Sequence, residues 1–139
     1  MKVTEIINRR RYGRTRINYC SEYVYGLKEL LGLFGLIQEE ERLQEVTYSH
    51  AKNILRSLLN RGIAYNEEFM TLEQAENYTN YLLEDFAENN CKCFSNGEWD
   101  KYRKTNHFGY NSMTKSTFDG GLIVTSTSYH FCFWVEEED

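Results

Sequence analysis

The stretch Leu122-Ile-Val-Thr-Ser-Thr-Ser-Tyr-His-Phe-Cys-Phe-Trp-Val135 decides the fold of this chain. β-Branched and aromatic residues dominate it, which is typical of strands that lie in a sheet. As one strand it would span about 45 Å at ~3.3 Å per residue, which is too long for a domain of this size. We therefore predict a break at the polar residues 125–128 and a hairpin of residues 122–125 against residues 129–135.

The second arm of this hairpin is apolar on both faces. Side chains alternate along a strand, so Phe131 and Phe133 point one way while Cys132 and Trp134 point the other. Neither face suits water, and both must be covered by helices, by a curl of the sheet or by a second subunit. We predict that the acidic residues 136–139 end the strand and keep an exposed edge from pairing with another chain.

Length and composition bound the class of protein. The chain has 139 residues, which predicts one domain over residues 1–139. It has no proline, and its many Asn, Tyr and Ile residues are typical of an AT-rich genome such as that of a phage or mobile element. The net charge of −5 argues against a general DNA coat. We see no signal peptide or membrane-spanning run, so we expect a cytoplasmic location, no membrane partner and reduced cysteines.

Three helices are predicted between residues 21 and 90. Ser21 is a good N-cap for an apolar helix over residues 21–37, and Thr47 caps an amphipathic helix that Gly62 ends. Thr71 opens a third helix with a capping-box pattern, and Leu72 and Phe86 are predicted to face inward. The acid-rich residues 38–46 are interpreted as a linker or a short acidic helix.

From residue 91 onward the pattern becomes that of strands. Asn96-Gly97 and Asp119-Gly120 are strong signals for two-residue hairpin turns, and with the closing hairpin they predict an antiparallel meander of about five strands. The fold class is therefore α+β, with about three N-terminal helices packed on a C-terminal antiparallel β-meander. Residues 1–20 form a basic arm or hairpin, residues 21–90 the helical part and residues 91–139 the sheet.

The hairpin at Asn96-Gly97 predicts a basic, aromatic face. Alternation places five side chains together: Lys92, Phe94, Trp99, Lys101 and Arg103. Cations for phosphate beside flat rings for a base are the ingredients of a nucleotide or single-stranded nucleic-acid site. The alternative is that the two rings pack beneath a helix while the long basic side chains spread over them.

An arginine arm is the second candidate surface. It carries five arginines: Arg9, Arg10, Arg11, Arg14 and Arg16. Guanidinium groups bind phosphates and carboxylates in a forked geometry, so the arm is a hypothetical contact for a partner or a nucleotide. The alternative is that the arm is neutralised by the acidic residues 136–139 of the same chain.

Motifs for metal binding and catalysis are weak or missing in the sequence. Cys91, Cys93, His130 and Cys132 would surround zinc only if their two strands were neighbours, and the spacing lacks a Cys-x-x-Cys turn, so no metal or other cofactor is predicted. We find no phosphate-binding loop, nucleophile elbow or paired metal-binding histidines, and therefore expect no enzymatic activity. Residues 38–61 also allow a helix-turn-helix interpretation, although the glutamates of its first half would repel DNA.

The leading expectation is a non-enzymatic binding protein. We expect a phage or mobile-element accessory protein that inhibits a host nucleic-acid-handling or defence complex, as an anti-CRISPR-like inhibitor would. Its partner would be a host protein or ribonucleoprotein complex. A nucleotide or single-stranded nucleic-acid binding module and a small helix-turn-helix regulator are the alternatives. The apolar surface of residues 21–37 also favours a homo-oligomer or another interface.

Overall fold

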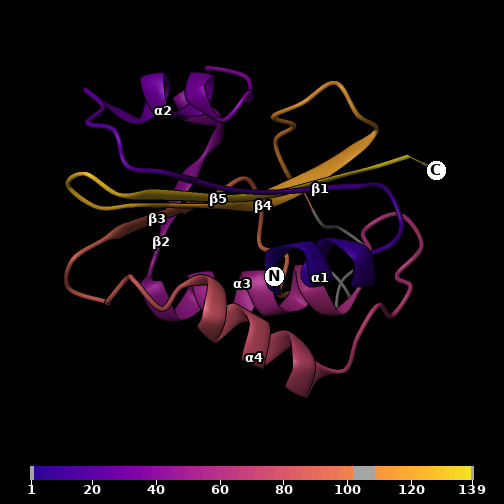
Figure 1. Cartoon of the computed structure of the whole chain (residues 1–139). Helices are drawn as coiled ribbons and strands as arrows, with labels where there is room; N and C mark the ends of the chain where they lie inside the picture. The colour runs from indigo at the N-terminus through magenta and orange to yellow at the C-terminus, as the bar shows by residue number, and fades with distance from the viewer. Residues whose placement is uncertain (1, 102–108, 139) are drawn as a thin grey trace.

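A computed structural model describes residues 2–101 and 109–138 and confirms the α+β fold class. Five strands form one antiparallel sheet in the order β1-β5-β4-β3-β2, with helices on both faces (Figure 1). The strands are β1 (Arg14–Cys20), β2 (Gln44–Val46), β3 (Lys92–Ser95), β4 (Phe118–Thr125) and β5 (His130–Glu137). The helices are α1 (Lys2–Arg9), α2 (Leu27–Leu33), the 3-10 turn η1 (Glu40–Arg42), α3 (Tyr48–Asn60) and α4 (Leu72–Leu82).

The predicted closing hairpin is confirmed as the pair β4 and β5. Thr125 lies opposite His130, and the Ser126 amide donates to the Tyr129 carbonyl across the turn. Residues 130–135 are all buried, so the predicted coverage of both faces is also confirmed. The prediction for the acidic end is wrong, because β5 pairs with β1 as well as β4 and Glu136 and Glu137 belong to it.

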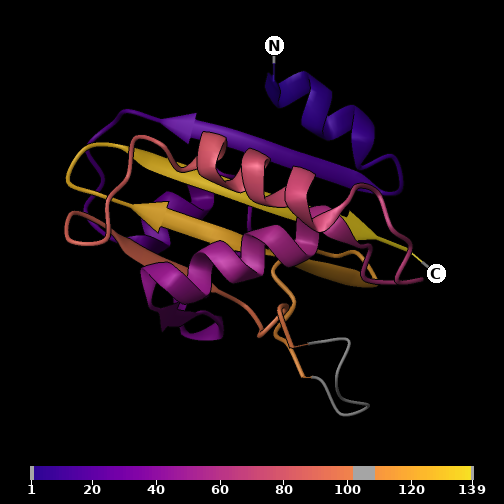
Figure 2. The same cartoon turned by 90° about the horizontal axis from the view of Figure 1, so that it is seen from below.

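Two hydrophobic cores lie on opposite faces of the sheet. Phe131 and Phe133 belong to the larger core, which also contains the inner faces of α3 and α4. Trp134 belongs to the smaller core together with Leu30 and Leu31 of α2. Figure 1 shows α2 above the sheet and α1, α3 and α4 below it, and Figure 2 shows α3 and α4 crossing the lower face. The result is a three-layer arrangement.

Residues 1–20, predicted as a basic arm or hairpin that begins with a short strand-like or single-turn piece, form a helix and a strand over their described part. Residues 2–9 form α1 because Val3, Ile6 and Ile7 lie on one side of a helix, and Ile6 is fully buried in the larger core. Residues 14–20 then form the edge strand β1, in which Arg14 lies opposite Glu136. The acid-rich residues 38–46 likewise form η1 followed by β2 at the other edge.

The helix predicted over residues 21–37 is much shorter in the structure, where α2 spans Leu27–Leu33. It begins at Leu27, after Gly26, and no side chain caps it, so Ser21 is not its N-cap. Gly35 has a φ of +74°, a conformation that glycine tolerates and that ends a helix. Residues 21–26 therefore form a loop that precedes α2.

The helices α3 and α4 begin as predicted. Thr47 Oγ1 accepts a hydrogen bond from the His50 amide at 3.1 Å. Thr71 and Gln74 form the reciprocal capping box, with distances of 3.1 and 3.0 Å. Leu72 does not face inward, since 59% of it is exposed at the first helical position.

Neither Asn96-Gly97 nor Asp119-Gly120 forms a hairpin turn. Asp119 and Gly120 lie inside β4, and the buried Asp119 carboxylate accepts hydrogen bonds from the Met113 amide at 2.9 Å and Trp134 Nε1 at 3.1 Å. The buried Asn96 amide donates to the Asp119 carbonyl at 3.0 Å. These turn-forming residue types instead build a buried polar network, and residues 98–101 are not a strand.

Candidate functional site

The upper layer of the molecule carries most of its net negative charge. Residues 21–46, here called the α2 face, include two cations and six glutamates: Lys28 and Arg42 against Glu22, Glu29, Glu39, Glu40, Glu41 and Glu45. The net charge of this segment is therefore −4, against −5 for the whole chain. Glu45 lies opposite Phe94, which packs on the smaller core, so β2 adds its charge to the same side of the sheet.

The α2 face also exposes large apolar side chains. The exposed fractions are 68% for Tyr23, 90% for Tyr25 and 50% for Leu33. The two tyrosine rings contact each other edge to face, with centroids 5.5 Å apart. Val24, between them, turns inward and packs against the smaller core. Residues 21–26 form an irregular loop in which Val24 is covered while the tyrosines on either side of it are exposed.

Two hydrogen bonds hold the tyrosine-bearing loop in place. The Tyr25 amide donates to Glu29 Oε2 at 2.8 Å. His130 Nε2 lies 2.9 Å from the Glu22 carbonyl oxygen, which can only accept, so Nε2 carries a hydrogen. His130 Nδ1 lies 2.6 Å from the Thr125 hydroxyl oxygen. The loop is thus organised before any partner binds, which reduces the entropy lost on binding.

A hollow adjoins this loop where the edge strand β1 meets the end of α2. It has a volume of about 540 Å³. Its walls come from Asn18, Tyr19, Cys20, Ser21 and Glu22 on one side and Leu33 and Phe34 on the other.

The sequence predicts one apolar helix over residues 21–37 with an interface on its surface, and it did not indicate the exposed tyrosine loop. Tyr25 was not singled out at all. Gly26 and Gly35, which bound α2, were the available signal that this helix is short. The use of this segment at an interface stays a prediction, and α2 itself spans seven residues.

Most arginines of the arginine arm form ion pairs with acidic side chains of the same chain. Arg10 is 1% exposed, and its guanidinium reaches Glu137 at 2.5 Å and the Leu58 carbonyl at 2.7 Å. Arg16 pairs with Glu136 at 2.8 Å. Neutralisation by the acidic end, the alternative interpretation, therefore holds for these two arginines. The others are more exposed: Arg11 pairs with Glu67, Arg9 lies 4.0 Å from Glu5, and Arg14 has no ion pair among the described residues.

The predicted basic, aromatic face does not assemble within the described residues. Without a hairpin at residues 96–97, Phe94 packs on the smaller core and Trp99 is buried in the larger one, on opposite faces of the sheet. Lys92 is exposed on β3, and Lys101 pairs with Glu98 at 3.2 Å. Arg103 lies outside the described residues.

The four residues of the hypothetical zinc site do not come from neighbouring strands. Cys93 lies on β3, whereas His130 and Cys132 lie on β5, and β4 lies between these two strands. Cys93 faces the larger core and Cys132 the smaller one. Burial raises the pKa of the Cys93 thiol to about 12, which disfavours the thiolate that zinc requires. Across residues 2–101 and 109–138, no three metal-binding side chains form a group.

The two-helix unit of the helix-turn-helix interpretation is not formed, because η1 and the edge strand β2 occupy residues 40–46. Within the part of the chain that the structure describes, no helix is long and apolar enough to cross a membrane. Comparisons of the chain with protein-family models, curated proteins and solved structures found no match.

Proposed function

We propose that this chain is a non-enzymatic binding protein whose α2 face attaches to a basic surface of a host nucleic-acid-handling protein or ribonucleoprotein complex and inhibits it. The observation that supports this proposal is the exposure of Tyr23, Tyr25 and Leu33 within a segment of net charge −4. Surfaces that bind nucleic acid are basic because they neutralise phosphates. An acidic surface with aromatic anchors competes for such a surface.

The two parts of the α2 face have different roles in this proposal. Tyrosine is enriched at interface positions that dominate binding energy, because it buries a large ring and keeps a polar hydroxyl. The surrounding glutamates speed association with a basic partner, and salt weakens their effect. The amino-acid composition, which is typical of an AT-rich genome, agrees with a phage or mobile-element accessory protein of the anti-CRISPR-like kind.

A site-specific photo-crosslinker tests the proposal in bacterial cells. It replaces Tyr25 in one variant and Tyr65 in a matched control, since Tyr65 is also a well-exposed tyrosine, at 61%. Residues 61–70 belong to the connection between α3 and α4, away from the α2 face. We expect the variant at position 25 to capture one basic nucleic-acid-binding protein, with added nucleic acid competing for the capture, and the variant at position 65 to capture none.

Three results would contradict the proposal. They are equal capture at both positions, capture of an acidic partner, and capture of a second copy of this chain, which would make the α2 face a homo-oligomer interface. A companion variant replaces Glu39, Glu40 and Glu41 with Gln. It should slow association with the captured partner several-fold without lowering the melting temperature, because these side chains are exposed.

A further inference from the structure

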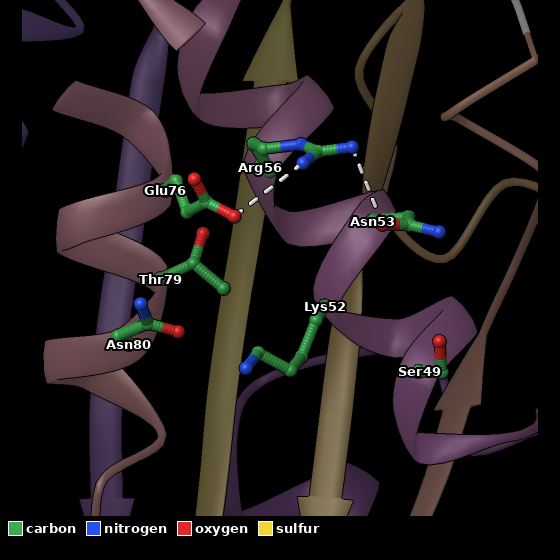
Figure 3. A pocket seen from close by; sticks show the side chains of 7 residues that line it. All are labelled: Ser49, Lys52, Asn53, Arg56, Glu76, Thr79 and Asn80. Carbon is green, nitrogen blue, oxygen red and sulfur yellow. Dashed lines mark hydrogen bonds and ion pairs between the residues drawn. The ribbon is translucent and has the colours of Figure 1, made fainter. Parts of the chain in front are cut away.

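The opposite side of the molecule carries a polar cleft that the proposed function does not use. It lies between the outward sides of α3 and α4 and has a volume of about 190 Å³ (Figure 3). Helix α3 contributes Ser49, Lys52, Asn53 and Arg56, at intervals of three and four residues that place them on one side of the helix. Helix α4 contributes Glu76, Thr79 and Asn80 in the same manner.

Thr79 gives this cleft an unusual feature. The residue is only 2% exposed, and its hydroxyl Oγ1 is buried without a hydrogen-bond partner. A threonine in a helix commonly donates to the carbonyl four residues earlier, but this one does not. Figure 3 shows the side chain pointing from α4 into the space between the helices, with its oxygen turned towards the end that holds Glu76 and Arg56. A buried hydroxyl without a partner forms a stabilising hydrogen bond when a ligand supplies an acceptor.

The cations of the cleft outnumber its carboxylates. Lys52 and Arg56 lie one helical turn apart, and Glu76 is the one acid that lines the cleft. No carboxylate of the described residues pairs with Lys52, whose ammonium lies 5.9 Å from the centre of the Tyr48 ring. Arg56 donates to Asn53 Oδ1 at 3.3 Å and lies 3.7 Å from Glu76. The cleft therefore has a net charge of +1 on a chain of net charge −5.

We propose that the α3–α4 cleft binds the phosphate group of a small phosphomonoester. The phosphate oxygens accept from the Thr79 hydroxyl, the Lys52 ammonium and the Arg56 guanidinium. In the free protein, a carboxylate oxygen of Glu76 lies 3.7 Å from the Arg56 guanidinium. The Glu76 side chain is 60% exposed, and it moves away from Arg56 when the ligand enters. This inference does not depend on the α2 face.

Size and charge indicate the ligand class. Pockets that enclose whole small molecules are usually at least about 300 Å³, so this cleft encloses an anionic group and leaves the remainder of the ligand outside. A phosphate offers three acceptor oxygens to three donors, whereas a carboxylate offers two. A polynucleotide is disfavoured because the exposed acids Glu73, Glu84 and Asp85 lie on or just after α4 and repel an extended polyanion.

The test is titration calorimetry of the full chain with O-phosphoserine, inorganic phosphate, acetate and a ten-nucleotide single-stranded DNA. We expect the two phosphate compounds to bind and acetate to bind at least about tenfold more weakly. Thr79→Val should weaken phosphate binding on the order of tenfold and raise the melting temperature of the ligand-free protein, because it removes an unsatisfied hydroxyl. Thr79→Ser keeps the hydroxyl and should keep the affinity.

Charge variants complete the test. Glu76→Gln should strengthen phosphate binding several-fold because it removes the competing carboxylate, and Lys52→Gln should weaken it about tenfold. Lys101→Gln, which changes a lysine outside the cleft, is the matched control and should have no effect. The inference is overturned if phosphate does not bind, if Thr79→Val lowers only stability, or if the oligonucleotide binds more tightly than O-phosphoserine.

Discussion

Arg10 shows how far neighbouring residues of one run of arginines can differ in burial. Its guanidinium is buried between the sheet and α3, where it contacts Glu137 Oε2, the Leu58 carbonyl and the Phe69 ring. The other oxygen of Glu137 accepts from the amides of Ile63 and Ala64, each at 2.9 Å. Burial lowers the pKa of Arg10, and the neighbouring Glu137 opposes that shift. Nothing in the run of arginines marks position 10 as the buried one.

Removing this guanidinium should strongly destabilise the protein. Arg10→Ala leaves Glu137 buried without its cation, for which we expect a loss of about 3–5 kcal/mol in the free energy of unfolding. Arg11→Ala is the control, because Arg11 and Glu67 form an exposed pair worth about 1 kcal/mol or less. Urea unfolding monitored by tryptophan fluorescence gives both values. Equal losses in the two variants would contradict a specific role for Arg10.

The buried thiol of Cys93 predicts a loss of stability in alkali. An unfolded cysteine ionises near pH 8.5 to 9, whereas burial raises the pKa of Cys93 to about 12 in the fold. Between these values the unfolded chain binds fewer protons than the folded one, so the free energy of unfolding falls as pH rises. Cys93→Ala should therefore lose less stability from pH 8 to pH 11 than the parent, whereas the partly exposed control Cys20→Ala should follow the parent. Superimposable pH profiles for Cys93→Ala and the parent would contradict this assignment.

At the scale of elements, β4 depends on two adjacent glycines. A Cβ atom on Gly121 would overlap the Phe133 carbonyl oxygen and the Trp134 ring, and one on Gly120 would overlap the Trp99 ring. The Gly-Gly pair thus lets two tryptophans pack directly on the strand, one on each side of the sheet. It is a packing feature, although beside Asp119 it has the composition of a turn.

Gly121→Ala should destabilise the protein by about 3 kcal/mol or more, because backbone atoms of β5 cannot move aside. Gly109→Ala is the matched control, since a Cβ atom at Gly109 meets no atom of the described residues within 4 Å and should change stability by about 0.5 kcal/mol at most. Thermal unfolding followed by circular dichroism measures both. A neutral Gly121→Ala variant would show that β4 and β5 are less closely packed than described.

The elements that the sequence predicted share strong local signals. Thr47 and Thr71 cap amphipathic helices, and residues 122–135 hold their apolar side chains on both strand faces. The edge strands lacked such signals: Ile17 is the one buried residue of β1, and β2 has three residues. Their pairing is also distant in sequence, since Arg16 meets a residue 120 positions away. Local turn signals at Asn96 and Asp119 failed because burial in a polar network outweighed them.

At the scale of the whole molecule, the sequence suggested an interface on residues 21–37 but neither its exposed tyrosine loop nor the α3–α4 cleft. The surplus of acids is visible in the composition, but its concentration on one side follows only from the fold, which places α2 above the sheet and directs Glu45 of the edge strand β2 to the same side as Phe94. Lys52 and Arg56 could be paired by helical spacing, yet Thr79 joins them only because α4 packs beside α3. Sites assembled from distant elements leave no motif, and a charge run such as residues 9–16 attracts attention in their place.

The interior position of β5 has a consequence for synthesis on the ribosome. β5 is the last strand of the sheet to be made, yet it lies between β1 and β4 and joins them. Until residues 130–137 are made, β1 has no strand partner and one edge of β4 is unpaired. The pairing of β1 therefore has to wait for β5, whereas β2, β3 and β4 can pair with one another before β5 is made.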